Sequence, residues 1–279
     1  MKSKVLLCSI VVSLFTVPGI AEWIFWTNGS GDRCWSNPQN WDLGRVPAAD
    51  DQVCMDHNCG GGPVIEGDIV VDWFVIGSGW EPGASLDCEV TIAEQANVLC
   101  NEFFIADNTT ANVVYNQYGN MTVNNISRLG LSGIATVNIY GGTFNSVGPL
   151  GIGYNPGSIT RVNIYNGSLE TTNTLVFSVY EATDILVDIQ GDGQLICGGS
   201  NFLIYFQHWI SQGWIKSYGL SERVGIDYGY LNPGKNTAYA LQYSARNRSD
   251  LNLDEIVDMD DFFLFASQWL LSETWWQTR

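Results

Sequence analysis

The residues best suited to chemistry lie near the C-terminal end, where oxygen-bearing positions recur over residues 250–261. Positions 1, 3, 5, 7, 9 and 12 of this stretch are Asp250, Asn252, Asp254, Ile256 (through its backbone carbonyl), Asp258 and Asp261. Ca²⁺ takes six to eight hard oxygen ligands, and twelve-residue calcium loops present them at these spacings, the ninth often through a water. The pattern therefore predicts that these six residues bind Ca²⁺.

An apolar segment follows the loop and predicts an exiting amphipathic helix over residues 262–270. Phe262, Phe265 and Trp269 recur at helical spacing on one face. A solvated acidic tail, the alternative interpretation, explains neither the oxygens at every ligand position nor the helix pattern. Glu255 stands at the sixth position, where glycine turns most easily, at a cost of roughly 1 kcal/mol. We therefore expect weak calcium affinity, toward the ~10⁻⁴ to 10⁻³ M range of extracellular modules.

The calcium segment resembles one repeat of a dockerin, in which aspartate rather than glutamate closes the loop at the position of Asp261. The resemblance implies docking onto a cohesin-like partner in an extracellular, usually polysaccharide-degrading, assembly. A full dockerin has two such loops, and residues 246–279 contain one. The single loop therefore does not identify a binding partner.

The other end of the chain has the features of a secretory signal peptide. Residues 1–4 are basic, residues 5–17 are apolar, and residues 18–21 offer small side chains before a cleavage site. The apolar run is shorter than the roughly 20 residues that a membrane-spanning helix needs. We therefore expect an exported chain that begins at Glu22, is secreted or held at the cell surface, and has no transmembrane segment.

The charge balance narrows the choice of partners. Acidic residues outnumber basic ones by 29 to 12, which gives a formal net charge of −17. Nucleic acid is excluded as a partner, because neutralising its phosphates requires clustered lysine and arginine.

Six cysteines remain when Cys8 of the signal peptide is set aside. An even number in an exported chain favours disulfides over catalytic thiols. We predict a small loop bridge between Cys54 and Cys59, with metal binding by this pair and His57 as the alternative. Cys88 is the more plausible partner for Cys100. Cys197 is then left over.

A repeat in the middle of the chain predicts the fold. The segment VNIYGGTF at residues 137–144 recurs as VNIYNGSL at 162–169 and as VDIQGDG at 187–193, with weaker copies at 114–119 and 90–92. A second short strand shares the period, at residues 75–77, 104–106, 130–132, 151–153 and 176–178. One such unit cannot bury its apolar face alone, whereas stacked units can.

The repeat therefore predicts a mainly β protein, a parallel β-solenoid with coils of about 23 to 25 residues. A β-sandwich is the alternative, but it does not require the same segment to return at a fixed interval. We divide the chain into the signal peptide (1–21), a Trp-rich N-terminal cap (22–62), the solenoid (63–200), a C-terminal cap (201–245) and the calcium-binding segment (246–279).

Both expected caps carry further resemblances. Residues 23–53 hold a pattern of Trp, Asn-Trp, Gly, Pro, Asp and Val that resembles the opening block of secreted bacterial β-solenoid proteins. The segment from residue 202, with a short helix over 206–210, strands at 214–219, 224–228 and 237–243 and a turn at 232–235, resembles the C-terminal part of repeat-rich secreted proteins of planctomycete-type bacteria. The tryptophans plug the open end of the solenoid or form a sugar-stacking platform.

The solenoid offers little for catalysis. Only Arg128 and Arg161 are basic in the central repeats, His57 and His208 lie near the caps, and Asp184, Asp188 and Asp192 have no basic neighbour in sequence. We therefore expect a secreted, non-catalytic binding or scaffold protein attached through its calcium-binding tail. A polysaccharide-active component, as lyase or carbohydrate-binding module, and a structural surface or adhesin protein are the alternatives.

Overall fold

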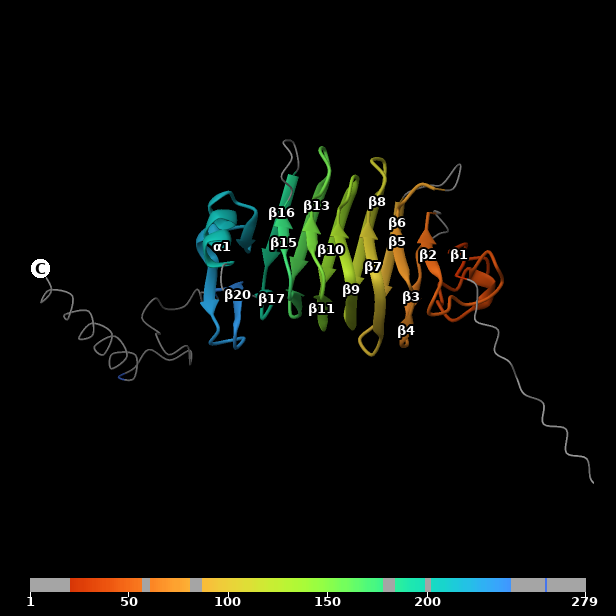
Figure 1. Cartoon of the computed structure of the whole chain (residues 1–279), viewed down its shortest axis with the longest axis horizontal. Coiled ribbons are helices and arrows are strands. Elements are labelled where there is room, and N and C mark those ends of the chain that lie inside the picture. Colours follow the sequence, from red (N-terminus) through yellow and green to blue (C-terminus); the bar gives the residue numbers. More distant parts are fainter. Residues whose placement is uncertain are drawn as a thin grey trace, which may run out of the picture.

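The computed structural model describes residues 21–56, 61–80, 87–177, 184–198, 202–241 and Met259. All six predicted calcium ligands, the helix expected over residues 262–270, residues 1–20 of the signal peptide, His57 and Cys59 lie outside this part of the chain. Within it, the chain forms a parallel β-solenoid whose coils follow one another along the long axis of the molecule (Figure 1).

One side of the solenoid is a seven-stranded sheet in which every neighbouring pair is parallel. Each coil contributes one strand to it. The strands are β3 (Val64–Ile65), β6 (Asp87–Ile92), β8 (Asn112–Gln117), β10 (Ile134–Ile139), β13 (Ile159–Ile164), β16 (Asp184–Ile189) and β18 (Ile215–Ser217).

A thirteen-stranded sheet supplies the other two sides. Its long strands β7 (Asn97–Ile105) and β9 (Asn120–Leu129) bend at a register shift between Cys100 and Glu102. Before the bend they align with β4 (Ile69–Val70), β11 (Thr143–Ser146), β14 (Ser168–Thr171) and β17 (Gln194–Gly198). After it they align with β1 (Trp23–Phe25), β2 (Gln52–Met55), β5 (Trp73–Ile76), β12 (Leu150–Ile152) and β15 (Leu175–Phe177).

The strand registers confirm the repeat. Val137 pairs with Val162, 25 residues later, and Val162 pairs with Val187 after the same interval. In the other direction Val137 pairs with Tyr115, 22 residues earlier. Strands that share a sequence pattern therefore share a position in their coils.

Two details of the repeat differ from the prediction. Each central coil has three strands rather than two. In one coil the additional strand is β11, in which the buried Phe144 lies between the polar residues Thr143 and Asn145. The strand predicted at residues 130–132 is displaced by two residues. Leu129, not Leu131, is aligned with both Ile105 and Ile152.

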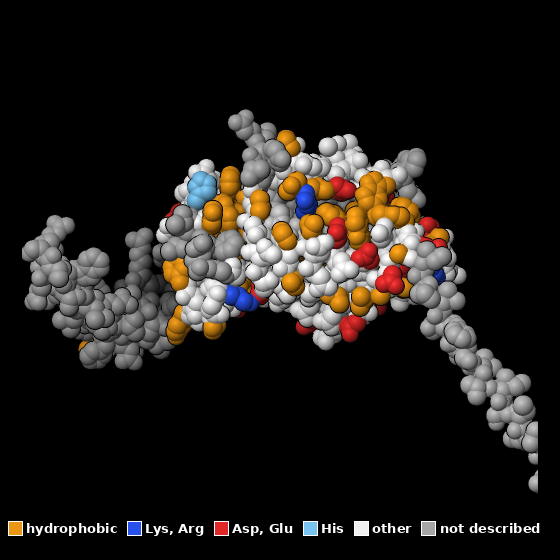
Figure 2. All heavy atoms as spheres, viewed as in Figure 1, with side chains coloured by type: hydrophobic (Ala, Val, Ile, Leu, Met, Phe, Trp, Pro, Cys, Tyr) orange, Lys and Arg blue, Asp and Glu red, His pale blue; other side chains and the backbone are white. Residues whose placement is uncertain are grey.

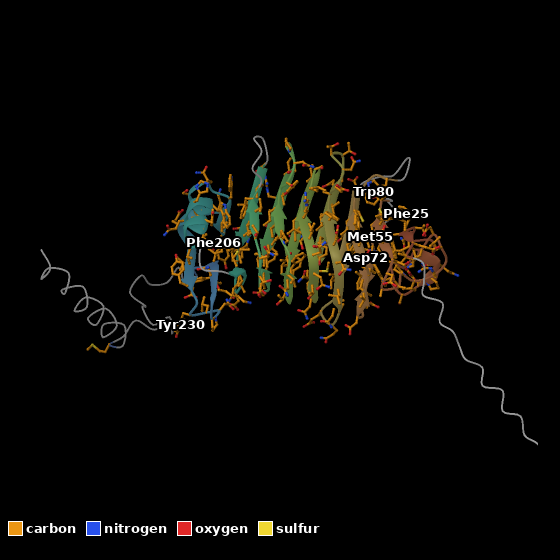
Figure 3. All side chains as sticks on the ribbon, viewed as in Figure 1. Phe25, Met55, Asp72, Trp80, Phe206 and Tyr230 are labelled. Atoms are coloured by element: carbon orange, nitrogen blue, oxygen red, sulfur yellow. The ribbon has the colours of Figure 1, made fainter. Side chains whose placement is uncertain are left out.

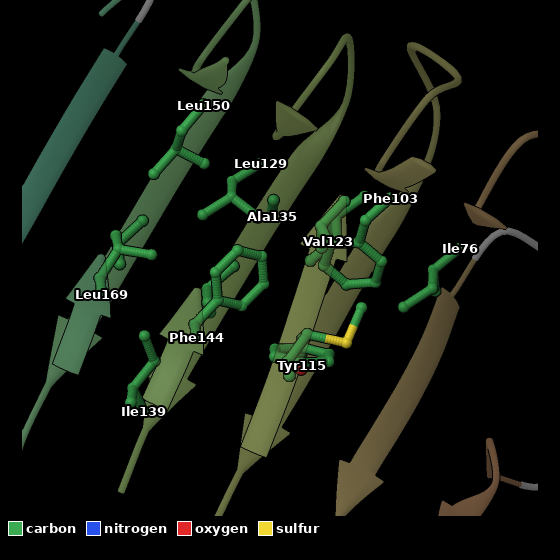
Figure 4. Packing of buried hydrophobic residues seen from close by; sticks show 14 of the residues in the cluster. Ile76, Phe103, Tyr115, Val123, Leu129, Ala135, Ile139, Phe144, Leu150 and Leu169 are labelled. Atoms are coloured by element: carbon green, nitrogen blue, oxygen red, sulfur yellow. The ribbon is translucent and has the colours of Figure 1, made fainter. Parts of the chain in front are cut away.

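The core fills the interior between the three sides (Figure 4). Alternation along each strand sends every second side chain inward. The rows thus formed are fully buried, as for Val137, Val162 and Val187 or for Phe144 and Leu169. Each such side chain stabilises the fold by about 1.5 to 3 kcal/mol relative to exposure.

Outward-facing amides form ladders that hold successive coils together. Asn163 donates to Asn138 at 2.8 Å, and Asn138 donates to Asn116 at 2.9 Å. Two residues further on, the rings of Tyr140 and Tyr165 stack with their centroids 4.9 Å apart. Because successive coils carry the same residue type at the same position, each of these side chains contacts a side chain of its own kind in the next coil.

The N-terminal end of the core is covered by tryptophans. Trp26, Trp35 and Trp41 are buried, and Trp41 packs edge-on against Trp26 at 5.0 Å and Trp35 at 4.6 Å. Trp35 also contacts Phe74 of β5 at 5.8 Å. These three rings plug the end of the solenoid, as the first of the two interpretations of the tryptophans expects.

The C-terminal end is closed by a helix and an antiparallel hairpin. Helix α1 (Phe202–Ser211) buries Phe206 and Trp209. Strand β20 (Lys235–Ala240) pairs antiparallel with both β17 and β19 (Val224–Tyr228). These elements fall where the sequence placed its helix and its later strands.

The predicted disulfide between Cys88 and Cys100 is wrong, because these two cysteines are not bonded to each other. The predicted Cys54–Cys59 bridge involves Cys59, which lies outside the described residues. Cys88 lies on β6 in the seven-stranded sheet, whereas Cys100 lies on β7 in the other sheet. The Sγ of Cys54 lies 3.1 Å from the Oγ of Ser78.

Cys100 and Cys197 occupy the same place in their coils. The ladder runs from Cys100 through Val123, Ser146 and Thr171 to Cys197. Four steps of ~4.8 Å put them ~19 Å apart, beyond the ~7 Å limit for a disulfide. Burial raises the pKa of both thiols, which keeps them protonated and unreactive.

Candidate functional site

Two of the three carboxylates that the sequence offered for catalysis, Asp184 and Asp188, form contacts that stabilise the fold. Asp184 forms an ion pair with Arg161. Asp188 accepts hydrogen bonds from the Nε2 of Gln190 at 2.7 Å and from the backbone N–H of Gly219 at 3.0 Å. Within the described ranges, no three His, Cys, Asp or Glu residues are grouped so that they could hold a metal ion.

A cluster of aromatic side chains lies on the outer face of the solenoid, at its N-terminal end. We call it the outer aromatic cluster, and it consists of Trp23, Phe25, Trp73, Trp80 and Phe104. All five are at least partly exposed, and Trp80 is 47 % exposed. Figure 2 shows hydrophobic side chains gathered over this end of the solenoid, with acidic side chains beside them.

The rings of the cluster contact one another across the coils. The centroid of Trp23 lies 4.5 Å from that of Trp80 and 5.9 Å from that of Trp73, both edge-on. Phe25 lies 6.5 Å from Trp23, and Phe104 lies 5.8 Å from Trp73. Figure 3 shows Phe25 and Trp80 at the same end of the molecule. Residues from β1, β5, β7 and the turn after β5 therefore form one continuous surface.

Strand alternation explains why these rings point outward. Ile24 and Phe74 face the core and are fully buried, so that their neighbours Trp23, Phe25 and Trp73 face away from it. Phe104 is likewise the outward residue between the buried Phe103 and Ile105. The cluster thus lies on the opposite side of the sheet from the core.

A buried carboxylate fixes the turn that carries Trp80. Asp56 accepts from the backbone N–H of Ser78 at 2.6 Å, from its Oγ at 2.5 Å and from the N–H of Trp80 at 2.8 Å. Burial alone raises the pKa of Asp56, but the hydrogen bonds from Ser78, Gly79 and Trp80 bring it below its ordinary value. Asp56 therefore stays ionised and holds the indole over the outer face.

The surface continues from the cluster to a cation and a second aromatic ring. Arg128 is the outward residue of β9 aligned with Phe104 in the neighbouring coil. Its guanidinium lies 3.8 Å from the centre of the Tyr154 ring. The next outward position in the same row is Gly151, where a Cβ would lie 3.5 Å from Tyr154 Cδ2, an ordinary van der Waals contact.

Asp107 lies beside the turn after β5, since the backbone N–H groups of its neighbours Ala106 and Asn108 donate to the carbonyl oxygens of Ile76 at 2.8 Å and Gly77 at 3.0 Å. It is half-buried, and burial followed by the Asp56 charge raises the pKa of its carboxyl, while the Arg128 charge partly offsets that rise. Among the described residues, neither the Asp107 carboxylate nor the Arg128 guanidinium has a hydrogen bond or an ion pair. An acceptor and a donor are therefore both available beside the aromatic surface.

Sequence reasoning identified only part of this site. The sequence places Trp23 among the tryptophans of a sugar-stacking platform and Arg128, with Arg161, as the basic residues of the central repeats. It does not indicate a role for the other members, Phe25, Trp73, Trp80, Phe104 and Asp107. The available signal was the sequence WFVI of β5, which is apolar on both faces where a surface strand alternates.

Comparison of the chain with protein-family models, with curated proteins and with solved structures gives no match. Within the described residues, no helix is both long enough and apolar enough to cross a membrane.

Proposed function

We propose that this protein is an extracellular, non-catalytic β-solenoid that binds polysaccharide on its outer aromatic cluster and is attached to a partner through a calcium-ordered tail. The solenoid is a rigid scaffold, compatible with a binding role. Strands of successive coils place aromatic and polar side chains along one surface, which suits an extended polymer more than a small enclosed ligand.

The observation that carries the proposal is the outer aromatic cluster. Exposed tryptophans are costly to leave in water, and contiguous apolar patches mark interaction surfaces. The C–H faces of sugar rings pack on indole and phenyl rings, while sugar hydroxyls bond to polar groups beside them. Trp23, Trp73 and Trp80 offer the first kind of contact, and Asp107 and Arg128 offer the second.

The tail argument rests on the donor set at residues 250–261. Asp250, Asn252, Asp254, Ile256, Asp258 and Asp261 would supply oxygens alone, the ligand type that Ca²⁺ requires. Bound Ca²⁺ would order the segment so that its apolar residues form one surface for a cohesin-like partner. Export, through the signal peptide, would place both activities outside the cell.

A binding panel tests the proposal directly. The full chain is applied to immobilised polysaccharides of the extracellular matrix and cell wall, neutral and acidic. We expect retention on at least one of them, in Ca²⁺ and in EDTA alike, because the outer aromatic cluster is remote in sequence from the calcium loop. Failure to be retained on any polysaccharide would overturn the proposed function.

The calcium site has a separate test. Titration of the full chain with Ca²⁺ in a calorimeter should give binding in the ~10⁻⁴ to 10⁻³ M range, and D250A combined with D254A should abolish it. E255G should tighten binding, since glycine removes the strain at position six. The matched control is D192N, which changes an acidic residue outside the loop. Absence of calcium-dependent heat from the unmodified chain would refute the site.

A further inference from the structure

We infer that the outer face selects an uncharged polysaccharide, and that Asp107 and Arg128 together bind hydroxyl groups of a sugar unit seated next to the outer aromatic cluster. This inference rests on the proposed function and specifies its ligand class. It is carried by two polar groups that have neither a hydrogen bond nor an ion pair among the described residues, one on the turn beside the outer aromatic cluster and the other aligned with Phe104.

The position of Arg128 favours a ligand contact over a structural role. The other arginine of the central repeats, Arg161, is bound to Asp184. Arg33 and Arg45 are likewise held, by Glu89 and by Glu22 with Asp51. Arg128 rests on the Tyr154 ring at 3.8 Å, which fixes the plane of the guanidinium and leaves its N–H groups available at the edge.

Asp107 supplies the complementary acceptor. Its carboxylate oxygens accept hydrogen bonds but donate none when ionised, while Arg128 only donates. A sugar hydroxyl does both, so a pair of neighbouring hydroxyls can donate to Asp107 and accept from Arg128. Phe104, aligned with Arg128 at the adjacent coil, provides an apolar surface for the same sugar ring.

The charge of the surroundings excludes an acidic glycan. A uronate or sulfate group that reached Arg128 would also face Asp107, whose pKa is already raised by burial and by the Asp56 charge. The whole chain carries a net charge of −17. Repulsion between like charges acts over a Debye length of about 8 Å at physiological salt. Hydroxyl groups meet no such repulsion.

The test compares soluble polysaccharides that differ in charge. Dissociation constants of the full chain are measured by calorimetry for xyloglucan and mixed-linkage β-glucan, which are uncharged, and for polygalacturonate and dextran sulfate, which are anionic. We expect binding to an uncharged polymer and at least tenfold weaker binding to both anionic ones.

Single substitutions test whether Asp107 and Arg128 contribute to binding. D107N and R128Q should each weaken binding of the uncharged polymer about tenfold, since each removes a hydrogen bond to a charged group. The matched controls D87N and R223Q change an exposed acid and a partly exposed base elsewhere and should leave affinity unchanged. Unchanged melting temperatures for all four variants would show that the fold is intact.

The outcomes distinguish the inference from the function on which it rests. If W80A weakens binding but D107N and R128Q do not, the polysaccharide function stands and the hydroxyl-binding pair is refuted. If an anionic polymer binds more tightly than the uncharged ones, the ligand class is wrong while the function stands. If no polymer binds, both are overturned.

Discussion

At the scale of single residues, the outer surface depends on a carboxylate that never touches it. Asp56 is 1 % exposed, yet it positions Trp80 through three hydrogen bonds to the turn at residues 78–80. Each bond to a charged acceptor contributes about 1.5 to 3 kcal/mol when both partners are otherwise satisfied. The exposed ring and the buried acid are therefore one structural unit.

We predict that D56N lowers the free energy of unfolding by about 2 kcal/mol at neutral pH, because an amide cannot accept from all three donors at once. The folded-state pKa of Asp56 lies below its ordinary value. Its contribution to stability is therefore complete above the ordinary Asp pKa near ~3.9 and is lost as the pH falls below that value.

Urea unfolding followed by circular dichroism at pH 7 and pH 3 checks this prediction. The difference between the wild-type chain and D56N should shrink at the lower pH. D87N, which changes an exposed carboxylate, serves as the control and should unfold like the wild-type chain at pH 7. A difference that grows toward pH 3 would contradict the role assigned to Asp56.

At the scale of elements, the close spacing between coils limits the size of the side chain that a corner residue can have. Gly148 lies at the corner between β11 and β12, where a Cβ would come within 1.5 Å of the backbone oxygen of Asn125 in the preceding coil. Backbone atoms cannot yield as a flexible side chain does. Close stacking of the coils therefore requires glycine here.

We predict that G148A destabilises the fold by about 3 kcal/mol or more, because the corner must move away from its neighbour and disturb the ladders on both sides. G67A is the matched control, since a Cβ at Gly67 meets no atom within 4 Å. Thermal unfolding of both variants checks the comparison. Equal melting temperatures for the two variants would contradict the close approach at Gly148.

At the scale of the whole molecule, the solenoid is predictable from the sequence because each coil repeats the same pattern of apolar side chains that face the core. Val137, Val162 and Val187 repeat at a fixed interval, and stacking them is the only way to bury all three. The third strand of each coil was missed because Thr143, Asn145 and Ser146 are polar, and a single inward Phe144 gives little periodicity.

The outer aromatic cluster could not be predicted for a different reason. Its members come from separate coils, and they meet only because the coils stack in a particular register. Trp23 and Trp73 stand 50 residues apart in sequence, yet they lie on strands separated only by β2. The turn that brings Trp80 to them depends on Asp56, an additional long-range contact.

The central claim, that the outer aromatic cluster is the polysaccharide-binding surface, is tested most directly by the affinity of W80A. Wild-type chain, W80A and Y228A are titrated with the uncharged polysaccharide that binds best. Tyr228 is a matched control, since it is 51 % exposed at the opposite end of the solenoid. We predict that W80A weakens binding tenfold or more, which corresponds to about 1.4 kcal/mol, and that Y228A binds like the wild-type chain. Equal affinities for W80A and the wild-type chain would contradict the account.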